Sequence, residues 1–257
     1  MDCRDELCAP TCPLGRPQDE WLRPRFTPPP EPAEEPSAEE IARFIDHTKL
    51  SPDATHEAIR RLCDEARRYG FAAVCVNPVW VPLCAEALAH TNVAVCTVVG
   101  FPLGAHRTET KVHEAELACH DGASEVDMVI NVGALKGGDL ETVAADVAAV
   151  TATAHAHGAL VKVILEVALL DEDEIAQACA ICEAVGADYV KTSTGFGPGG
   201  ATPQNVALLR HHVGPTVGVK AAGGIKSYRD AVTMLRAGAS RLGASAGVAI
   251  VEGAPST

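Results

Sequence analysis

Three apolar segments of this sequence carry a lysine at the same place in a repeating unit. The segments are Leu160-Val161-Lys162-Val163-Ile164-Leu165, Asp188-Tyr189-Val190-Lys191 and Val217-Gly218-Val219-Lys220-Ala221-Ala222. Successive lysines are 29 residues apart, because they stand at positions 162, 191 and 220. A strand that buries a lysine must pair or neutralise it, since removing the ammonium from water is costly. The spacing therefore predicts a repeated strand–helix unit that points an amine in the same direction each time.

Glycine marks the end of most predicted helices. An apolar strand follows shortly after each of Gly122, Gly158, Gly186, Gly214 and Gly238. The predicted strands start near residues 44, 73, 94, 125, 161, 189, 217 and 241. Strict alternation of strands and helices requires parallel strands and right-handed crossovers. Eight such units between residues 38 and 257 predict an α/β fold of the (β/α)8 TIM barrel type, rather than an open doubly wound sheet.

The first 37 residues differ in composition from the rest. Residues 1–37 hold nine prolines and lack regular hydrophobic spacing, which predicts a disordered extension before one barrel domain at residues 38–257. Ser37-Ala38-Glu39-Glu40 is a capping box that opens the first helix. Ser51-Pro52 is expected to begin the next helix, which Gly70 ends.

The ten cysteines are explained mainly by packing. Seven fall within predicted helices or strands, where a reduced cysteine acts as a small hydrophobe: Cys63, Cys75, Cys84, Cys96, Cys119, Cys179 and Cys182. Cys179 and Cys182 have the spacing of a redox or zinc half-motif, but with Ile175 they follow the buried stripe of a helix. Cys3, Cys8 and Cys12 lack a clear fourth ligand, so a solvated tail is favoured over a metal site.

The charge and hydropathy exclude several classes of partner. The net charge is −13 and no basic stripe is present, so we expect no nucleic-acid partner. No apolar run approaches ~18 residues, and the N-terminus lacks the apolar core of a signal peptide. We therefore expect a cytoplasmic protein without a membrane partner. A homodimer is compatible with these features.

Charged side chains are predicted to gather inside the barrel. Strand alternation points Lys162, Lys191 and Lys220 inward, and Asp127 likewise. A cation near a lysine disfavours the ammonium form and supplies a free amine, which attacks carbonyl compounds. Asp127 can accept and return protons. A structural ion pair explains any single lysine, but three on consecutive strands facing an aspartate favour a catalytic site.

Glycine-rich segments follow the last three strands. The candidate phosphate-binding residues are Thr194, Gly195, Gly223, Gly224, Gly243 and Ser245. Glycine lets backbone N–H groups approach an anion closely, and nearby helix starts add partial positive charge. One such cluster is more often a tight turn, but three on adjacent strands predict a phosphate-bearing substrate.

Several longer motifs resemble those of one enzyme family. They include Ile45-Asp46-His47-Thr48-Lys49-Leu50, Val76-Asn77-Pro78, Val98-Val99-Gly100-Phe101-Pro102-Leu103-Gly104, Glu125-Val126-Asp127-Met128-Val129-Ile130-Asn131-Val132-Gly133-Ala134-Leu135, Lys191-Thr192-Ser193-Thr194-Gly195-Phe196 and Val219-Lys220-Ala221-Ala222-Gly223-Gly224-Ile225. Over roughly residues 39–253 the chain resembles the deoxyribose-phosphate aldolases, which are class I enzymes that form a Schiff base. The last three motifs are long and specific. The proline-rich extension is the one departure from the family pattern.

The resemblance implies a reaction and a role for each site residue. The implied reaction is reversible cleavage of 2-deoxy-D-ribose 5-phosphate to acetaldehyde and D-glyceraldehyde 3-phosphate, with no metal or organic cofactor. Lys191 would form the imine, Lys220 would keep that amine reactive, and Asp127 would relay protons with Lys220. Lys162 and Asp46 are assigned supporting roles.

Two alternatives remain open at this stage. A different Schiff-base barrel aldolase, such as a transaldolase-like enzyme, would share the lysine and the phosphate loops but use another donor. A catalytically inactive barrel could serve as a binding module through its cysteine-containing tail. Intact Asp127, Lys191 and Lys220 argue against the second alternative, because buried charges are costly to keep without a use.

Overall fold

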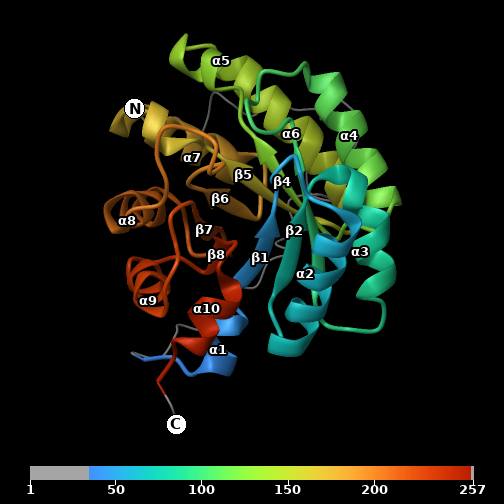
Figure 1. Ribbon diagram of the computed structural model, residues 1–257. Coiled ribbons are helices and arrows are strands. Elements are labelled where there is room, and N and C mark those ends of the chain that lie inside the picture. Colours follow the sequence, from blue (N-terminus) through green and yellow to red (C-terminus); the bar gives the residue numbers. More distant parts are fainter. Residues whose placement is uncertain (1–34, 256–257) are drawn as a thin grey trace.

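The computed structural model describes residues 35–255, which form a closed barrel of eight parallel strands (Figure 1). The strands are β1 (Ile45–Lys49), β2 (Ala73–Val76), β3 (Ala94–Val99), β4 (Glu125–Val129), β5 (Leu160–Ile164), β6 (Tyr189–Lys191), β7 (Gly218–Ala222) and β8 (Arg241–Ala244). They pair in chain order, and β8 closes the barrel by pairing with β1. The predicted TIM barrel is confirmed, and every strand begins within one residue of its predicted start.

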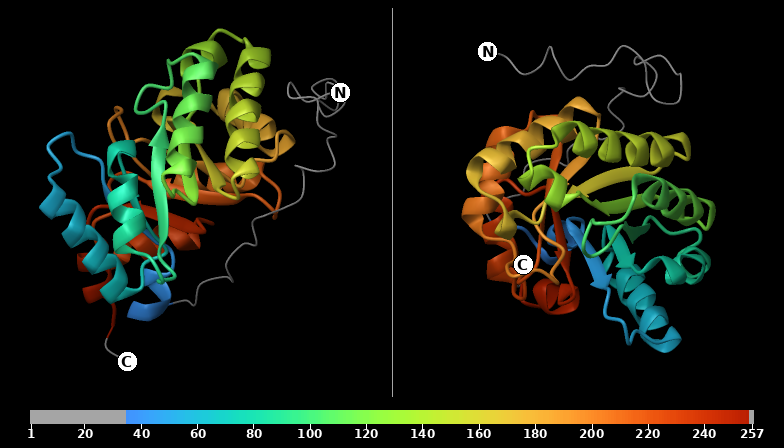
Figure 2. Two further views of the ribbon diagram at one scale, coloured as in Figure 1. Left: turned by 90° about the vertical axis from the view of Figure 1, so that its right-hand side faces the viewer. Right: turned by 90° about the horizontal axis from the view of Figure 1, so that it is seen from above.

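The helices cover the outside of the barrel (Figures 1 and 2). Those between strands are α2 (His56–Tyr69), α3 (Val81–Ala87), α4 (Thr108–His120), α5 (Val132–Lys136), α6 (Leu140–Ala156), α7 (Glu172–Ala184), α8 (Pro203–His212) and α9 (Tyr228–Arg236), with the 3-10 turns η2 (Pro78–Trp80) and η3 (Val167–Leu169). The terminal helices α1 (Ala38–Ala42) and α10 (Gly247–Glu252) pack against each other. Within residues 35–255, no helix has the length and apolar character needed to cross a membrane.

The start of the barrel domain lies at the junction with the predicted extension. Residues 1–34 of that extension, with Cys3, Cys8 and Cys12, lie outside the described residues. Ser37 caps α1 through the predicted capping box. Pro36 is already buried, and its carbonyl accepts a hydrogen bond of 2.8 Å from the Tyr228 hydroxyl. The packed structure therefore begins no later than Pro36.

The predicted start of α2 at Ser51-Pro52 is wrong. The helix begins at His56, with the Thr55 side chain as its N-cap, and Gly70 ends it as predicted in the left-handed conformation. Residues 51–54 form a turn instead, closed by a hydrogen bond of 3.2 Å from the Ala54 N–H to the Ser51 carbonyl. The serine and proline resemble a helix start locally, but Thr55 is the residue that caps the first helical N–H groups.

The barrel wall has different chemistry on its two faces. Outward-facing side chains pack against the helices: Val126, Val161, Val190 and Val219 are among them. Inside the barrel, β1 to β3 contribute a small apolar cluster that consists of Leu50, Ala73, Cys75, Cys96 and Val98. Asp46 on β1 and the strands β4 to β8 contribute charged side chains to the interior, all of them largely buried. The charged groups therefore lie beside an apolar wall, where their interactions are stronger than in water.

A buried ion pair fixes the C-terminal end of β4, the strand that carries Asp127. Helices α4 and α6 lie side by side (Figure 2). Lys111 of α4 forms a buried salt bridge with Asp146 of α6, and its ammonium also donates to the Val129 carbonyl at 2.9 Å. Two helices and the end of the strand are thereby joined.

The seven cysteines among residues 35–255 are all free thiols. Cys179 and Cys182 are buried in α7 together with Ile175, so the predicted core packing of this pair is confirmed. Burial raises the pKa of both thiols, which keeps them protonated and unreactive.

Candidate active site

Asp127 lies at the centre of the charged cluster inside the barrel. Its Oδ2 atom accepts hydrogen bonds from the ammonium groups of Lys191 and Lys220, each at 2.7 Å. Its Oδ1 atom accepts one from Lys162 at 2.8 Å. All three lysines predicted to face Asp127 therefore contact it, and Lys191 and Lys220 share one oxygen. Asp46 on β1 is also in the cluster, where one carboxylate oxygen contacts Lys220.

The mutual pairing decides which of these groups are ionised. Burial disfavours the charged form of Asp127, but Lys162, Lys191 and Lys220 together hold the pKa of that carboxyl well below its usual range. Burial likewise disfavours the Lys220 ammonium, but Asp127 and Asp46 raise the pKa of Lys220 above its ordinary value. Lys162 behaves in the same way, with Asp127 as the main charge that raises its pKa. These groups remain ionised at neutral pH.

A cavity of about 430 Å³ opens next to this cluster. It is lined by Thr48, Lys49, Leu50, Ser51, Pro52, Lys191, Thr194, Gly195, Phe196, Ala222, Gly223, Gly224, Ile225, Lys226, Gly243, Ala244 and Ser245. Its volume suits a small metabolite, because ligand pockets usually span about 300–1,000 Å³. Of the three lysines on Asp127, Lys191 is the one that lines the cavity. The amine best placed to meet a bound carbonyl is therefore that of Lys191.

The six predicted phosphate-binding residues line the same cavity as Lys191. Gly195, Gly223 and Gly224 have φ angles of 83°, 91° and 85°, a region that glycine enters without strain. Loops β6–α8 and β7–α9 also touch, since a Cβ on Gly200 would lie 2.5 Å from the Gly223 carbonyl oxygen. Because glycine has no side chain, a bound anion can reach the backbone N–H groups of these loops directly.

Two buried charges of the cluster were missed from the sequence. Glu125 on β4 accepts from the Lys162 ammonium at 2.6 Å. The Arg241 guanidinium on β8 contacts Asp46 at 2.7 Å and Glu125 at 3.2 Å. Glu125 stands two residues before Asp127, so strand alternation already placed it inward. Arg241 gave a weaker signal, because its partners belong to strands far away in the sequence.

Glu166 is a further residue that the sequence did not reveal. It follows β5 in the left-handed conformation, at φ 57° and ψ 56°, which is uncommon for a residue with a side chain. Its buried carboxylate accepts hydrogen bonds from both the N–H and the hydroxyl of Thr194. A Cβ on Gly197 would lie 2.7 Å from the Glu166 carboxyl carbon. Glu166 therefore fixes the start of the loop that begins at Thr194.

Two further lysines line the cavity away from Asp127. Lys49 ends β1, and the exposed Lys226 follows Gly223-Gly224-Ile225. The position of Lys226 directly after a predicted phosphate loop was the signal that could have identified it. Both add positive charge to the lining of the cavity.

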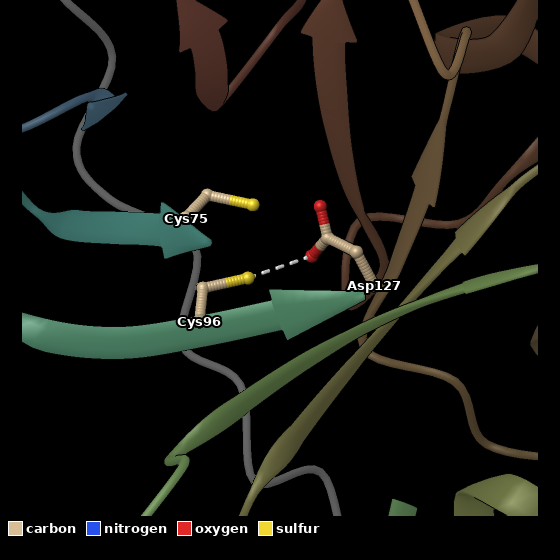
Figure 3. Close-up of side chains that lie close together, drawn as sticks. All are labelled: Cys75, Cys96 and Asp127. Carbon is tan, nitrogen blue, oxygen red and sulfur yellow. Dashed lines mark hydrogen bonds between the residues drawn. The ribbon is translucent and has the colours of Figure 1, made fainter. Parts of the chain in front are cut away.

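The donor atoms around Asp127 do not fit a resident metal ion. Among residues 35–255, potential ligand atoms approach within 4.8 Å in the set Cys75, Cys96 and Asp127 and in the set Asp46, Cys96 and Glu125. Figure 3 shows the first set, in which the Cys96 thiol lies 3.1 Å from Asp127 Oδ1. The Lys162 ammonium contacts both of these residues, so a cation would face a fixed positive charge. Burial also raises the pKa of Cys96, which opposes the thiolate form that binds metals.

Comparison with known proteins identifies the family. The model of the DeoC/LacD family aldolases matches residues 41–253. The chain belongs to this aldolase family. It is 57% identical over 213 residues to a deoxyribose-phosphate aldolase from Geobacillus sp. strain WCH70, covering 83% of this chain and 95% of that protein. A deoxyribose-phosphate aldolase from Thermococcus kodakarensis is 58% identical over 218 residues, covering 84% and 97%.

Solved structures of this aldolase family agree with the fold. The deoxyribose phosphate aldolase from Aeropyrum pernix, described as a tetramer, superposes with a TM-score of 0.79 at 39% identity. The alignment covers 84% of this chain and 91% of that chain. The sequence-based resemblance is therefore confirmed, and the chain is an enzyme of the lyase class rather than an inactive barrel.

Proposed function

We propose that this chain is a class I aldolase that reversibly cleaves 2-deoxy-D-ribose 5-phosphate to acetaldehyde and D-glyceraldehyde 3-phosphate. The observation that carries the proposal is the position of Lys191. Lys191 lines the cavity together with the glycine-rich loops, and its amine contacts Asp127 at 2.7 Å. The relatives named deoxyribose-phosphate aldolase support the choice of substrate.

Lys191 is the proposed nucleophile. Its free amine attacks C1 of the open-chain sugar, and loss of water gives an imine. The protonated imine withdraws electrons, so that removal of the C3 hydroxyl proton breaks the C2–C3 bond. Glyceraldehyde 3-phosphate leaves, and the remaining enamine is protonated at carbon. Water then hydrolyses the imine, which releases acetaldehyde and restores the amine.

Asp127 and Lys220 are the proposed proton relay. Asp127 is a carboxylate that contacts both the nucleophile and Lys220, so it can accept a proton on the side of Lys191. Lys220 is held protonated by Asp127 and Asp46, so it can return a proton through the shared oxygen. Lys162 holds the other oxygen of Asp127 and thereby keeps the carboxylate oriented.

The first prediction tests the substrate directly. Purified protein with 2-deoxyribose 5-phosphate should produce glyceraldehyde 3-phosphate and acetaldehyde in equal amounts. A coupled dehydrogenase assay follows the first product, and an alcohol dehydrogenase assay follows the second. A transaldolase-like enzyme would release no acetaldehyde, so its absence during turnover would contradict the proposed donor.

The second prediction concerns the phosphate group. Ser245→Asp places a negative charge in the loop after β8, where it should repel the phosphate and raise KM for the phosphorylated sugar by about 100-fold. The KM for unphosphorylated 2-deoxyribose should change much less. Ser245→Asn is the matched control of similar size without charge, and it should have the smaller effect. Equal losses for both sugars in Ser245→Asp would mean that this loop does not hold the phosphate.

Self-association and location in the cell are two further predictions. Self-association into a homodimer is supported only by the description of the Aeropyrum pernix relative as a tetramer. A cytoplasmic location is consistent with degradation of a phosphorylated sugar, which is the proposed activity.

A further inference from the structure

The charges of the ionised side chains inside the barrel do not sum to zero. The cations are Lys162, Lys191, Lys220 and Arg241, and the anions are Asp46, Glu125 and Asp127. Four positive and three negative groups leave one positive charge in excess when all are ionised. An uncompensated charge in a buried cluster is costly, and losing one proton from one lysine would remove it.

One of the four cations has fewer carboxylate partners than the others. The Arg241 guanidinium stays charged at any pH where the protein is folded, and its carboxylate partners raise its pKa further despite burial. Lys162 contacts Asp127, Glu125 and Cys96, and Lys220 contacts two carboxylates, which raises the pKa of both lysines. Lys191 contacts one carboxylate, whose oxygen it shares with Lys220. Lys191 therefore has the weakest ion pairing of the four cations.

Arg241 reaches this cluster from the side of the barrel away from the cavity. It does not line the cavity, and its side chain is 12% exposed. It occupies one oxygen of Asp46, which leaves the other oxygen for Lys220. Its guanidinium also contacts Glu125 and lies over the Tyr189 ring at 5.6 Å.

We propose that Arg241 is a positioning residue for the aldolase reaction: it is the permanent cation that keeps the cluster one positive charge in excess and so favours the free amine of Lys191. The proposal rests on the imine chemistry proposed above. Arg241 would act without touching the substrate, through charge and through the orientation of Asp46.

The other groups around Lys191 do not supply this charge. The titratable or charged side chains in the cluster or next to it are Asp46 on β1, Cys75 on β2, Cys96 on β3, Glu125 and Asp127 on β4, Lys162 on β5, Tyr189 on β6, Lys220 on β7 and Arg241 on β8. Lys49 and Lys226 also line the cavity, but within residues 35–255 neither forms an ion pair with the carboxylates of the cluster. Burial raises the pKa of Cys96 and of Tyr189, so both are neutral at pH 7. Cys75 lies against Cys96, whose hydrogen bond lowers the pKa of Cys75 while burial opposes ionisation. Cys75 is therefore the group whose charge the experiment must check.

The test measures borohydride trapping of acetaldehyde on Lys191 as a function of pH. Arg241→Met removes the excess charge, so Lys191 should keep its proton to higher pH. A unit charge at this depth changes the proton affinity of a neighbour by about tenfold, so the midpoint of trapping should rise by about one pH unit. Arg241→Lys keeps the charge and should restore the wild-type midpoint, although its contacts with Asp46 and Glu125 differ.

Glu125→Gln makes the test specific to charge. It removes an anion, increases the positive excess and should move the midpoint of trapping to lower pH. The double variant Glu125→Gln with Arg241→Met should return close to the wild type. A purely structural disturbance would not move the two single variants in opposite directions. If Arg241→Met alone fails to fold, Glu125→Gln and the double variant still test the proposal.

Two controls separate charge from packing. Tyr189→Phe removes the hydroxyl beside Arg241 without changing charge, and Cys75→Ala removes the thiol next to Cys96. Both should leave the midpoint unchanged, and an acid shift in Cys75→Ala would show a thiolate that already balances the cluster, which would overturn the proposal. Unshifted midpoints in Arg241→Met and Glu125→Gln would overturn it as well. Absence of trapping in the wild type would instead reject the proposed imine, so the two failures are distinguishable.

Discussion

Lys191→Met is expected to abolish turnover and borohydride trapping together, with a loss in kcat of at least about 1000-fold. Methionine has a similar length and fills the same space, but it cannot form an imine. Lys191 is the lysine of the cluster that lines the cavity, so no neighbouring amine can replace it without a large shift of the backbone. The remaining lysines keep Asp127 paired, so the barrel should stay folded.

Peptide mass mapping identifies the modified lysine. Wild-type protein reduced with borohydride in acetaldehyde should gain one ethyl group on the peptide that carries Lys191. Lys226→Met is the matched control, because Lys226 also lines the cavity but belongs to the loop after β7. This variant should still be trapped. An adduct on Lys162, Lys220 or Lys226 in the wild type would contradict the assignment of the nucleophile.

The strands and their inward-facing residues could be predicted because they follow a local rule. Successive side chains on a strand point to opposite faces, so one buried lysine fixes the orientation of its neighbours. Lys162, Lys191, Lys220 and Asp127 were found in this way, and the structure brings them into contact. The glycine-rich loops were identified by composition, and their place at the ends of adjacent strands brought them to one cavity.

Contacts between distant strands could not be predicted by that rule. The pairing of β8 with β1 decides that Arg241 meets Asp46, and their register follows from closure of the whole barrel. Glu166 was missed for a different reason, since its left-handed backbone is held by the surrounding structure. The start of α2 was mispredicted because Ser51 and Thr55 are both acceptable caps, and the choice depends on tertiary packing.

Lys220→Met should shift the trapping profile of Lys191 to higher pH by more than one unit, since Lys220 is closer than Arg241 and shares an oxygen of Asp127 with the nucleophile. Each unit reduces the free amine at neutral pH by about tenfold, so imine formation should slow steeply and recover in alkali. Lys220→Arg keeps the charge but cannot give up a proton, so it should restore the midpoint without restoring turnover. A Lys220→Met profile that overlays the wild type would reject the electrostatic role and leave Lys220 only as a proton donor.

Lys220→Met should also destabilise the barrel. The pH dependence of this loss of stability follows from the direction in which the fold shifts the pKa of Lys220. The folded protein raises this pKa above its ordinary value, because Asp127 and Asp46 outweigh burial. The pairing therefore stabilises the fold fully below the unfolded pKa of about 10.4, and this contribution is lost as pH rises toward the folded pKa. At pH 7 the loss should be about 3 kcal/mol, since two buried carboxylates lose a partner. Urea unfolding at pH 7 and at about pH 11 measures it, and the difference from the wild type should narrow at the higher pH. A difference independent of pH would indicate lost packing, because the contribution from the charge pairing of Lys220 decreases as pH rises toward its folded pKa.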